Sequence, residues 1–263
     1  MLTLQTAWAE SFDHDSWNAL LNKYVHEIND GKASVVDYQG LADHRQLLTQ
    51  YLQSQSAVTQ ARFDQWPSNE QLAFLINAYN AWTVELVLTA WPDLSSIKDL
   101  GGLLTSPWSK RFIPLFGKQL SLDDIEHQLI RGSGRYNDPR IHFAVNCASV
   151  GCPALRSEAY RGEKLDAQLD EQTGNFLRDK SRNRVQDDEL QLSAIFKWYR
   201  EDFEKGWSGY NSLEDFLVDH AQALELTSAM ARELELGDME IVFLDYDWRL
   251  NYADTLAPTS SEP

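Results

Sequence analysis

The only two cysteines of the chain, Cys147 and Cys152, lie in one short segment together with His142. A thiolate is a strong nucleophile, and a thiol enzyme also needs a base that forms the thiolate and a polar group that orients the base. Cys152 precedes Pro153, which suits the first position of a helical turn, where free N–H groups lower the pKa of a thiol. These residue types predict the functional site between His142 and Cys152, with Cys147 as the nucleophile and Cys152 as its rival.

Two of the six histidines are candidate bases. His142 is nearest to Cys147, but residues 140–146 alternate like a β-strand, so the two side chains point to opposite faces unless the chain bulges. His127 is the second candidate and lies on a predicted helix over residues 122–131. The residues expected to orient the base, as Asn and Asp do in other thiol enzymes, are Asn77, Asn80 and Asp247.

Other interpretations of the same residues stay open. In an exported protein the two cysteines could form a disulfide, and buried cysteines are often inert. With His142 and His127 they could bind zinc, although their spacing differs from the Cys-x-x-Cys of most zinc and thioredoxin-type redox sites. Asn77 and Asn80 could form a buried hydrogen-bond network instead. The sequence contains no glycine-rich phosphate loop and no His-Glu-x-x-His helix, and no cofactor is predicted.

Helical periodicity of the hydrophobic residues covers most of the chain. The clearest helix begins with a capping box at Ser68 and Gln71 and ends before Pro92. Further helices are predicted over residues 15–26, 40–53, 122–131, 165–180, 193–203, 212–224 and 228–234, and residues 93–120 are predicted to be an irregular connection. Extended segments are predicted at residues 34–38, 140–146, 184–192 and 239–245, the third as a hairpin. This pattern indicates one α+β domain, mostly helical around a small antiparallel sheet.

The charge of the chain restricts its partners. Acidic residues number 40 against 23 basic ones, which gives a formal net charge of -17. A duplex or an anionic membrane would be repelled, so nucleic acid is not an expected partner. No apolar run is long enough to span a bilayer, so no membrane span is predicted. A small-molecule or peptide-like substrate, neutral or cationic, is compatible with this charge.

The N-terminal residues carry a possible export signal. Ala7-Trp8-Ala9 matches the small-x-small pattern that signal peptidase cleaves, and the residues before it are largely apolar. We therefore interpret residues 1–9 as the remnant of a signal peptide, which predicts a periplasmic or secreted protein. The globular domain is expected over residues 10–256, and the polar residues 257–263 are expected to form a loose tail.

Several blocks of the chain resemble the family known as domain of unknown function 547. They are AFLINAYNA at residues 73–81, LSLDDIEH at 120–127, RIHFAVNCAS at 140–149, GCPALR at 151–156, FKWY at 196–199, DF at 202–203 and YDWRLN at 246–251. Together they extend over roughly residues 35–251. The family name supplies no activity. The structural analogy that the resemblance implies is to papain-like and transglutaminase-like thiol enzymes, and a fold-level analogy does not establish function.

The function predicted from these observations is that of a thiol hydrolase or acyltransferase acting on an amide or thioester of a peptide-like substrate. Cys147 or Cys152 would attack, and His142 or His127 would be the base. The alternative is a non-catalytic envelope binding or scaffold domain with a Cys147–Cys152 disulfide, or a metal or redox site.

Overall fold

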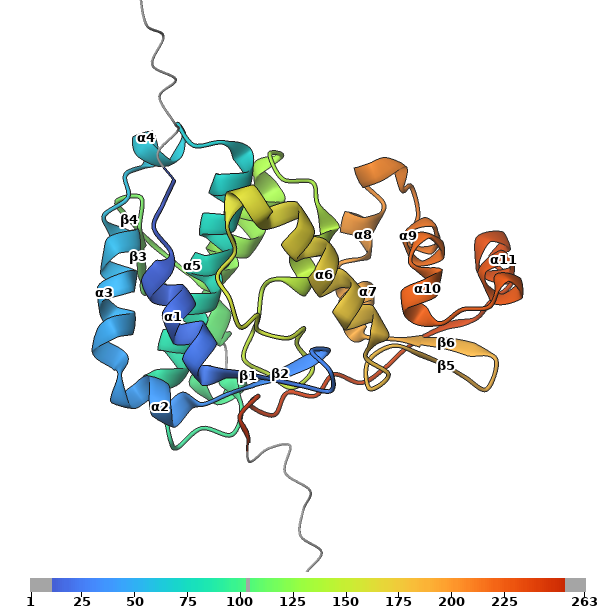
Figure 1. Cartoon of the computed structure of the whole chain (residues 1–263), viewed down its shortest axis with the longest axis horizontal. Helices are drawn as coiled ribbons and strands as arrows, with labels where there is room; N and C mark the ends of the chain where they lie inside the picture. The colour runs from blue at the N-terminus through green and yellow to red at the C-terminus, as the bar shows by residue number, and fades with distance from the viewer. Residues whose placement is uncertain (1–10, 103–104, 254–263) are drawn as a thin grey trace, which may run out of the picture.

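The computed structural model describes residues 11–102 and 105–253 (Figure 1). The predicted signal-peptide remnant, residues 1–9, and the predicted tail, residues 257–263, lie outside the described residues. None of the helices that the structure describes has the length and apolar character that a membrane span requires.

One long helix organises the N-terminal part of the molecule. This helix, α5 (Ser68–Leu88), is apolar around nearly its whole circumference and is therefore surrounded by other elements. Its neighbours at this end of the molecule (Figure 1) are α1 (Asp15–Tyr24), α2 (Tyr38–Asp43), α3 (Arg45–Ser56) and α4 (Gln60–Phe63). Their buried faces and α5 form the first hydrophobic core.

The C-terminal helices build a second hydrophobic core at the other end of the molecule (Figure 1). They are α6 (Leu165–Arg178), α7 (Ala194–Trp198), α8 (Arg200–Phe203), α9 (Leu213–Asp219), α10 (Ala221–Leu224) and α11 (Ser228–Leu236). Phenylalanine rings fill this core, with centroid separations of 4.9 Å for Phe143–Phe176 and 5.2 Å for Phe196–Phe203. Aromatic pairs at these distances add packing energy beyond their buried area.

The strands form short, separate sheets. β1 (Val25–Ile28) pairs antiparallel with β2 (Ala33–Val36), and β3 (Ile113–Leu115) pairs antiparallel with β4 (Lys118–Leu120). The predicted hairpin is present as β5 (Arg184–Gln186) and β6 (Glu189–Leu192), and the predicted last strand, β7 (Ile241–Phe243), pairs parallel with β6. The α+β class and the mostly helical character are confirmed. The prediction of one small antiparallel sheet is wrong, because the described strands are divided among several sheets and one pair is parallel.

The strand predicted over residues 140–146 is wrong. The structure has a 3-10 helix, η5 (Pro139–Phe143), which begins at Pro139 and is capped by the Asp138 side chain. The alternation of apolar residues has a different cause, since Ile141 packs in the first core and Phe143 in the second. A segment that passes between two cores needs apolar residues on two sides, so its sequence resembles that of a strand.

Other local differences concern helix ends. The helix predicted over residues 40–53 is divided into α2 and α3 at His44, and the one over residues 193–203 is divided into α7 and α8 at Tyr199. The predicted capping box at Ser68 and Gln71 is absent. The Gln71 amide donates instead to the carbonyls of Phe63 and Trp66. Residues 93–120 contain the β3–β4 hairpin, which the sequence pattern did not predict.

Candidate functional site

A cavity of about 450 Å³ contains most of the predicted site residues. Both cysteines, His142 and His127 line it, whereas Asn77, Asn80 and Asp247 do not. Its volume is in the range of pockets that enclose small molecules. The cavity is therefore the candidate functional site. Several elements contribute to its lining, among them α5, η5, the loop that follows η5, α7 and the segment after β7.

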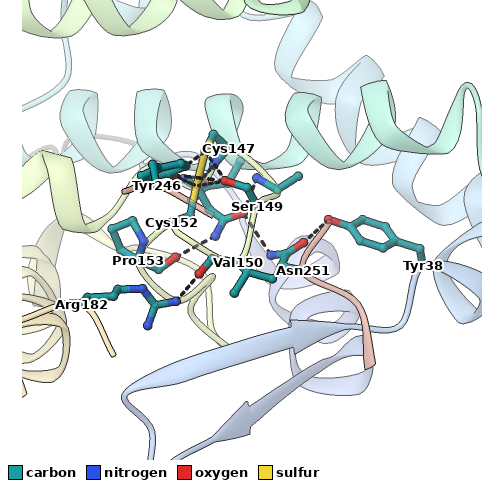
Figure 2. Close-up of a disulfide and its surroundings, with 12 residues drawn as sticks. Tyr38, Cys147, Ser149, Val150, Cys152, Pro153, Arg182, Tyr246 and Asn251 are labelled. Carbon is teal, nitrogen blue, oxygen red and sulfur yellow. Dashed lines mark hydrogen bonds between the residues drawn. A yellow bond between two sulfur atoms is a disulfide. The ribbon is translucent and has the colours of Figure 1, made fainter. Parts of the chain in front are cut away.

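The cysteines form a disulfide within the loop at residues 146–152 (Figure 2). Asn146 shapes the loop, because its amide donates to the Pro153 carbonyl at 2.7 Å and its carbonyl accepts the Ala148 N–H at 2.9 Å. The Val150 N–H donates to the Arg249 carbonyl at 2.8 Å, which ties the loop to the C-terminal segment. No helical turn begins at Pro153, since residues 153–161 are irregular, so the predicted helix N-terminus at Cys152 is wrong.

Hydroxyl and amide groups surround the two sulfurs (Figure 2). The Tyr246 hydroxyl lies 3.1 Å from each Sγ, and Ser149 Oγ lies 3.1 Å from the Sγ of Cys147. The Cys147 N–H donates to the Sγ of Cys152 at 2.9 Å. Cys152 is 3% exposed and Cys147 is only half-buried. Among the described residues, no imidazole is a hydrogen-bond partner of either sulfur in this oxidised form.

His142 is oriented by a carboxylate that the sequence did not single out. Its Nε2 lies 2.7 Å from Oδ2 of Asp202, and its ring stacks on Tyr199 with centroids 3.9 Å apart. Burial lowers the pKa of His142 more than the hydrogen bond that it donates to Asp202 raises it, so the ring is neutral near pH 7. A neutral ring that donates Nε2–H to Asp202 carries its lone pair on Nδ1, which has no partner among the described residues.

Asp202 is held ionised by its neighbours. Burial opposes the charge, but hydrogen bonds from His142, Arg131 and Lys205 outweigh burial and keep the pKa of Asp202 below its usual range. Arg131 Nε and Lys205 Nζ each lie 2.5 Å from an oxygen of Asp202. The carboxylate is therefore available to stabilise an imidazolium at His142. The available signal was an acidic residue within a predicted helix, residues 193–203, that contains four aromatic residues.

A π-helix, η3 (Asp124–Ile130), brings two neighbouring residues to the cavity. Glu126 is 5% exposed, and its Oε1 has no donor among the described residues. His127 is more exposed, with Nδ1 2.8 Å from Arg131 Nη1 and Nε2 3.8 Å from an oxygen of Asp123. Adjacent residues of a helix do not share a face, but both Glu126 and His127 contribute to the cavity lining. π-turns are rare and often occur at functional sites.

The predicted orienting residues have other roles in the structure. The Asn77 side chain accepts the Tyr160 N–H at 3.0 Å and donates to the Tyr160 carbonyl at 2.8 Å. Asn80 accepts the Asn146 N–H at 2.8 Å and donates to the Ala144 carbonyl at 3.0 Å, so it positions the segment that leads to Cys147. Both asparagines form the buried network that was the alternative interpretation.

Asp247 contacts the disulfide loop through its backbone, because its carbonyl accepts the Gly151 N–H at 2.8 Å. It forms an ion pair with Arg249 and accepts the Arg249 N–H at 3.0 Å. It lines a second cavity of about 300 Å³ together with Arg182. The carboxylate partner of the His142 ring is Asp202. The prediction that Asn77, Asn80 or Asp247 orients this ring is therefore wrong.

The zinc interpretation finds no support in the arrangement of ligands. Within residues 11–102 and 105–253, no group of three or more His, Cys, Asp and Glu side chains is placed to hold a metal ion. The two sulfurs are bonded to each other, which removes the thiolates that a zinc site would need.

A comparison with protein families finds a match and adds no activity. Residues 63–177 match the family described as "Protein of unknown function, DUF547". The predicted resemblance is confirmed over this segment. This segment includes α5, η3, η5, the disulfide loop and most of α6. No curated protein and no solved structure matches the chain.

Proposed function

We propose that the protein is a thiol hydrolase or acyltransferase that acts on an amide or thioester of a peptide-like substrate. Cys147 is the nucleophile, His142 is the base and Asp202 orients and stabilises the His142 ring. One observation carries the proposal: the cavity that contains Cys147 also contains an imidazole whose Nε2 is held by a carboxylate and whose Nδ1 lacks a partner. This base with its orienting group is the arrangement that thiol enzymes need.

The disulfide is the oxidised resting form in this proposal. Two equivalents of an external thiol reduce it, forming one external disulfide and two cysteine thiols. Cys147 is the sulfur assigned to attack, because it is the less buried of the two. The proposed location, periplasmic or outside the cell, rests on the Ala7-Trp8-Ala9 pattern and is compatible with a disulfide that forms and is reduced by partner thiols.

The reaction then follows ordinary acyl-transfer chemistry. His142 takes the Cys147 proton, and the thiolate attacks the carbonyl carbon of the substrate. The C–N or C–S bond breaks as His142 returns the proton to the leaving amine or thiol, which leaves an acyl group on the sulfur. Water or an acceptor amine attacks this thioester and restores the thiol. Asp202 stabilises the imidazolium that exists between the two proton transfers.

The test measures how His142 affects the reactivity of Cys147. In a Cys152→Ser variant, Cys147 is the only thiol, and its rate of alkylation by iodoacetamide is measured by intact mass at pH 6 and pH 8.5. An ordinary thiol is about 0.3% ionised at pH 6. We expect a rate at pH 6 at least about 10-fold above that of the same variant carrying His142→Gln or Asp202→Asn, because the imidazole promotes thiolate formation. His26→Gln, at an exposed position, is the matched control.

The disulfide itself favours a second candidate, a binding domain without catalysis. In that case the bridge only stabilises the loop beside the cavity. Equal alkylation rates in the His142→Gln, Asp202→Asn and control variants, with all of them folded by circular dichroism, would contradict the thiol mechanism and favour the binding domain.

A further inference from the structure

The Glu126 carboxylate is a buried negative charge with incomplete hydrogen bonding. It lies in η3 beside Tyr79 and Tyr199. Burial raises the pKa of both phenols, and so do the Glu126 charge and a hydrogen bond of each phenol with this carboxylate. Its Oε1 is inaccessible to solvent and has no donor among the described residues. An unmet charged acceptor in a protein interior is destabilising. A bound ligand that donates to this carboxylate would complete its hydrogen bonding.

The nearby cations are already engaged by other groups. Arg131 interacts electrostatically with Glu126, but its Nε pairs with Asp202 at 2.5 Å and its guanidinium lies over the Tyr199 ring at 4.8 Å. Lys205 also binds Asp202. Asp123, a second carboxylate, lines the same cavity. Among the described residues, neither Glu126 nor Asp123 forms a salt bridge with Arg131 or Lys205, so both carboxylates contribute negative charge to the cavity.

The wall of the cavity is aromatic and partly exposed. Trp198 is 48% exposed, stacks on Trp248 with centroids 5.8 Å apart and lies 4.9 Å from Tyr246. Trp108 contacts Trp248 edge-on at 5.7 Å. An exposed tryptophan beside carboxylates is the environment that attracts ammonium groups through their charge and alkyl stems through their apolar surface.

The protein already uses this mode of contact at the same wall. The Lys98 ammonium lies 4.2 Å from the centroid of the Trp248 ring. Trp248 thus contacts an ammonium group of the chain itself. The ring of Trp198 is half-exposed and could contact an ammonium group of a ligand in the same way.

From these observations we infer that the cavity binds a ligand with a cationic amino group at the end of an apolar stem, such as a lysine-type side chain. The amino group donates to Glu126, and the stem packs against Trp198. The inference rests on the proposed function in one respect: in a thiol acyl transfer, the bound amine is part of the peptide-like substrate or is the acyl acceptor. The binding itself involves neither sulfur.

The experiment measures binding to the oxidised full-length chain by calorimetry. The probes are n-pentylammonium, n-pentanol and pentanoate, which share a stem and differ in the terminal group. We expect n-pentylammonium to bind at least about 10-fold more tightly than n-pentanol, because the ammonium donates a charge-assisted hydrogen bond to Glu126. Pentanoate should not bind, because the carboxylates of the cavity repel its charge. Nα-acetyl-lysine amide and its norleucine counterpart repeat the comparison with peptide-like probes.

Two variants connect the preference to the named residues. Glu126→Gln keeps the shape of the side chain and should abolish the preference for ammonium over alcohol. Glu201→Gln, at an exposed position on α8, is the matched control and should leave the preference unchanged. Trp198→Ala should weaken all alkyl probes together, because it removes the apolar wall.

The outcomes separate this inference from the proposed function. Equal binding of ammonium and alcohol, or an unchanged preference in folded Glu126→Gln, would overturn the cationic ligand, whatever the thiol does. Failure of the alkylation test leaves this measurement unaffected, because the oxidised chain has no free thiol. A preference that disappears in Glu126→Gln and persists in Glu201→Gln supports the inference.

Discussion

Two groups of buried polar side chains differ in how their hydrogen-bonding atoms are satisfied. On α5, Asn77 and Asn80 each donate once and accept once, with backbone partners at 2.8–3.0 Å. At the cavity, Glu126 Oε1 and His142 Nδ1 have no partner among the described residues, although both side chains are at most 5% exposed. The two asparagines are buried in the protein interior, whereas Glu126 and His142 line the cavity of about 450 Å³.

This difference separates stability from function. A buried amide with all its bonds made contributes to one specific packing of the chain. A buried carboxylate or imidazole with an unmet atom contributes less to stability and leaves an atom that a substrate can bind. The two kinds of residue should therefore respond oppositely to substitution.

The largest effect is expected at Asn80. Asn80→Ala leaves the Asn146 N–H and the Ala144 carbonyl buried without partners, and each such loss costs about 1–3 kcal/mol, so the free energy of unfolding should fall by about 2–4 kcal/mol. Urea denaturation measures the change. Asn69→Ala, at an exposed position of the same helix, is the control and should change stability by less than about 0.5 kcal/mol. Equal effects of the two substitutions would contradict a structural role for Asn80.

His14 sharpens the comparison, because it is buried with an unmet Nε2 but lines none of the cavities described above. Burial, assisted by the charge of Arg161, lowers its pKa from 6.5 to about 3. The unfolded chain takes up this proton below pH 6.5 and the folded chain only near pH 3, so stability falls as the pH drops between these values. At pH 5 the loss from this residue is about 2 kcal/mol relative to pH 7.

The measurement compares unfolding free energies at pH 7 and pH 5. His14→Asn retains a polar group near Tyr51, the partner of His14 Nδ1 at 2.7 Å, and removes the titration. The variant should lose less stability than the wild type between the two pH values, by about 2 kcal/mol. His26→Asn, at an exposed position, should behave like the wild type. A parallel pH dependence of His14→Asn and wild type would refute the assignment.

The smallest effect, and one of opposite sign, is expected at Glu126. Glu126→Gln removes a buried charge whose Oε1 has no donor, so the free energy of unfolding should stay unchanged or rise by up to about 1 kcal/mol. Thermal denaturation measures this change in the free energy of unfolding, and Glu201→Gln is the control. A loss of more than about 1 kcal/mol would place Glu126 with Asn80 among the structural residues and remove the contrast between the two groups.

Local sequence patterns predicted the elements well where a single core determines the periodicity. α5 follows helical spacing because nearly all of its faces contact the first core, and the β5–β6 hairpin turns at two acidic residues with positive φ. The pattern failed over residues 140–146, where neighbouring residues pack in different cores. An alternation of hydrophobic residues indicates which residues are buried. It does not show whether they are the two faces of a β-strand or residues of another structure that pack into two different cores.

The candidate site was predicted in part. The sequence indicated Cys147, Cys152 and His142, which lie in one segment, and His127, and all four line the cavity. It did not indicate Asp202, Arg131 or Tyr246 as site residues. Their roles depend on contacts such as His142–Asp202, which joins residues 60 positions apart, and Tyr246–Cys152, which joins residues 94 positions apart.

The sequence by itself determined the resemblance to the family over residues 63–177, the mostly helical α+β class and the segment that carries the sulfurs. These depend on residue types and on spacing within a few turns. Tertiary structure decided that the cysteines are bonded to each other, that Asp202 is the partner of His142, and that the α5 asparagines lie in the core. These features depend on which distant groups meet in a buried place, where every polar atom needs a partner, and short-range periodicity carries no information about that pairing.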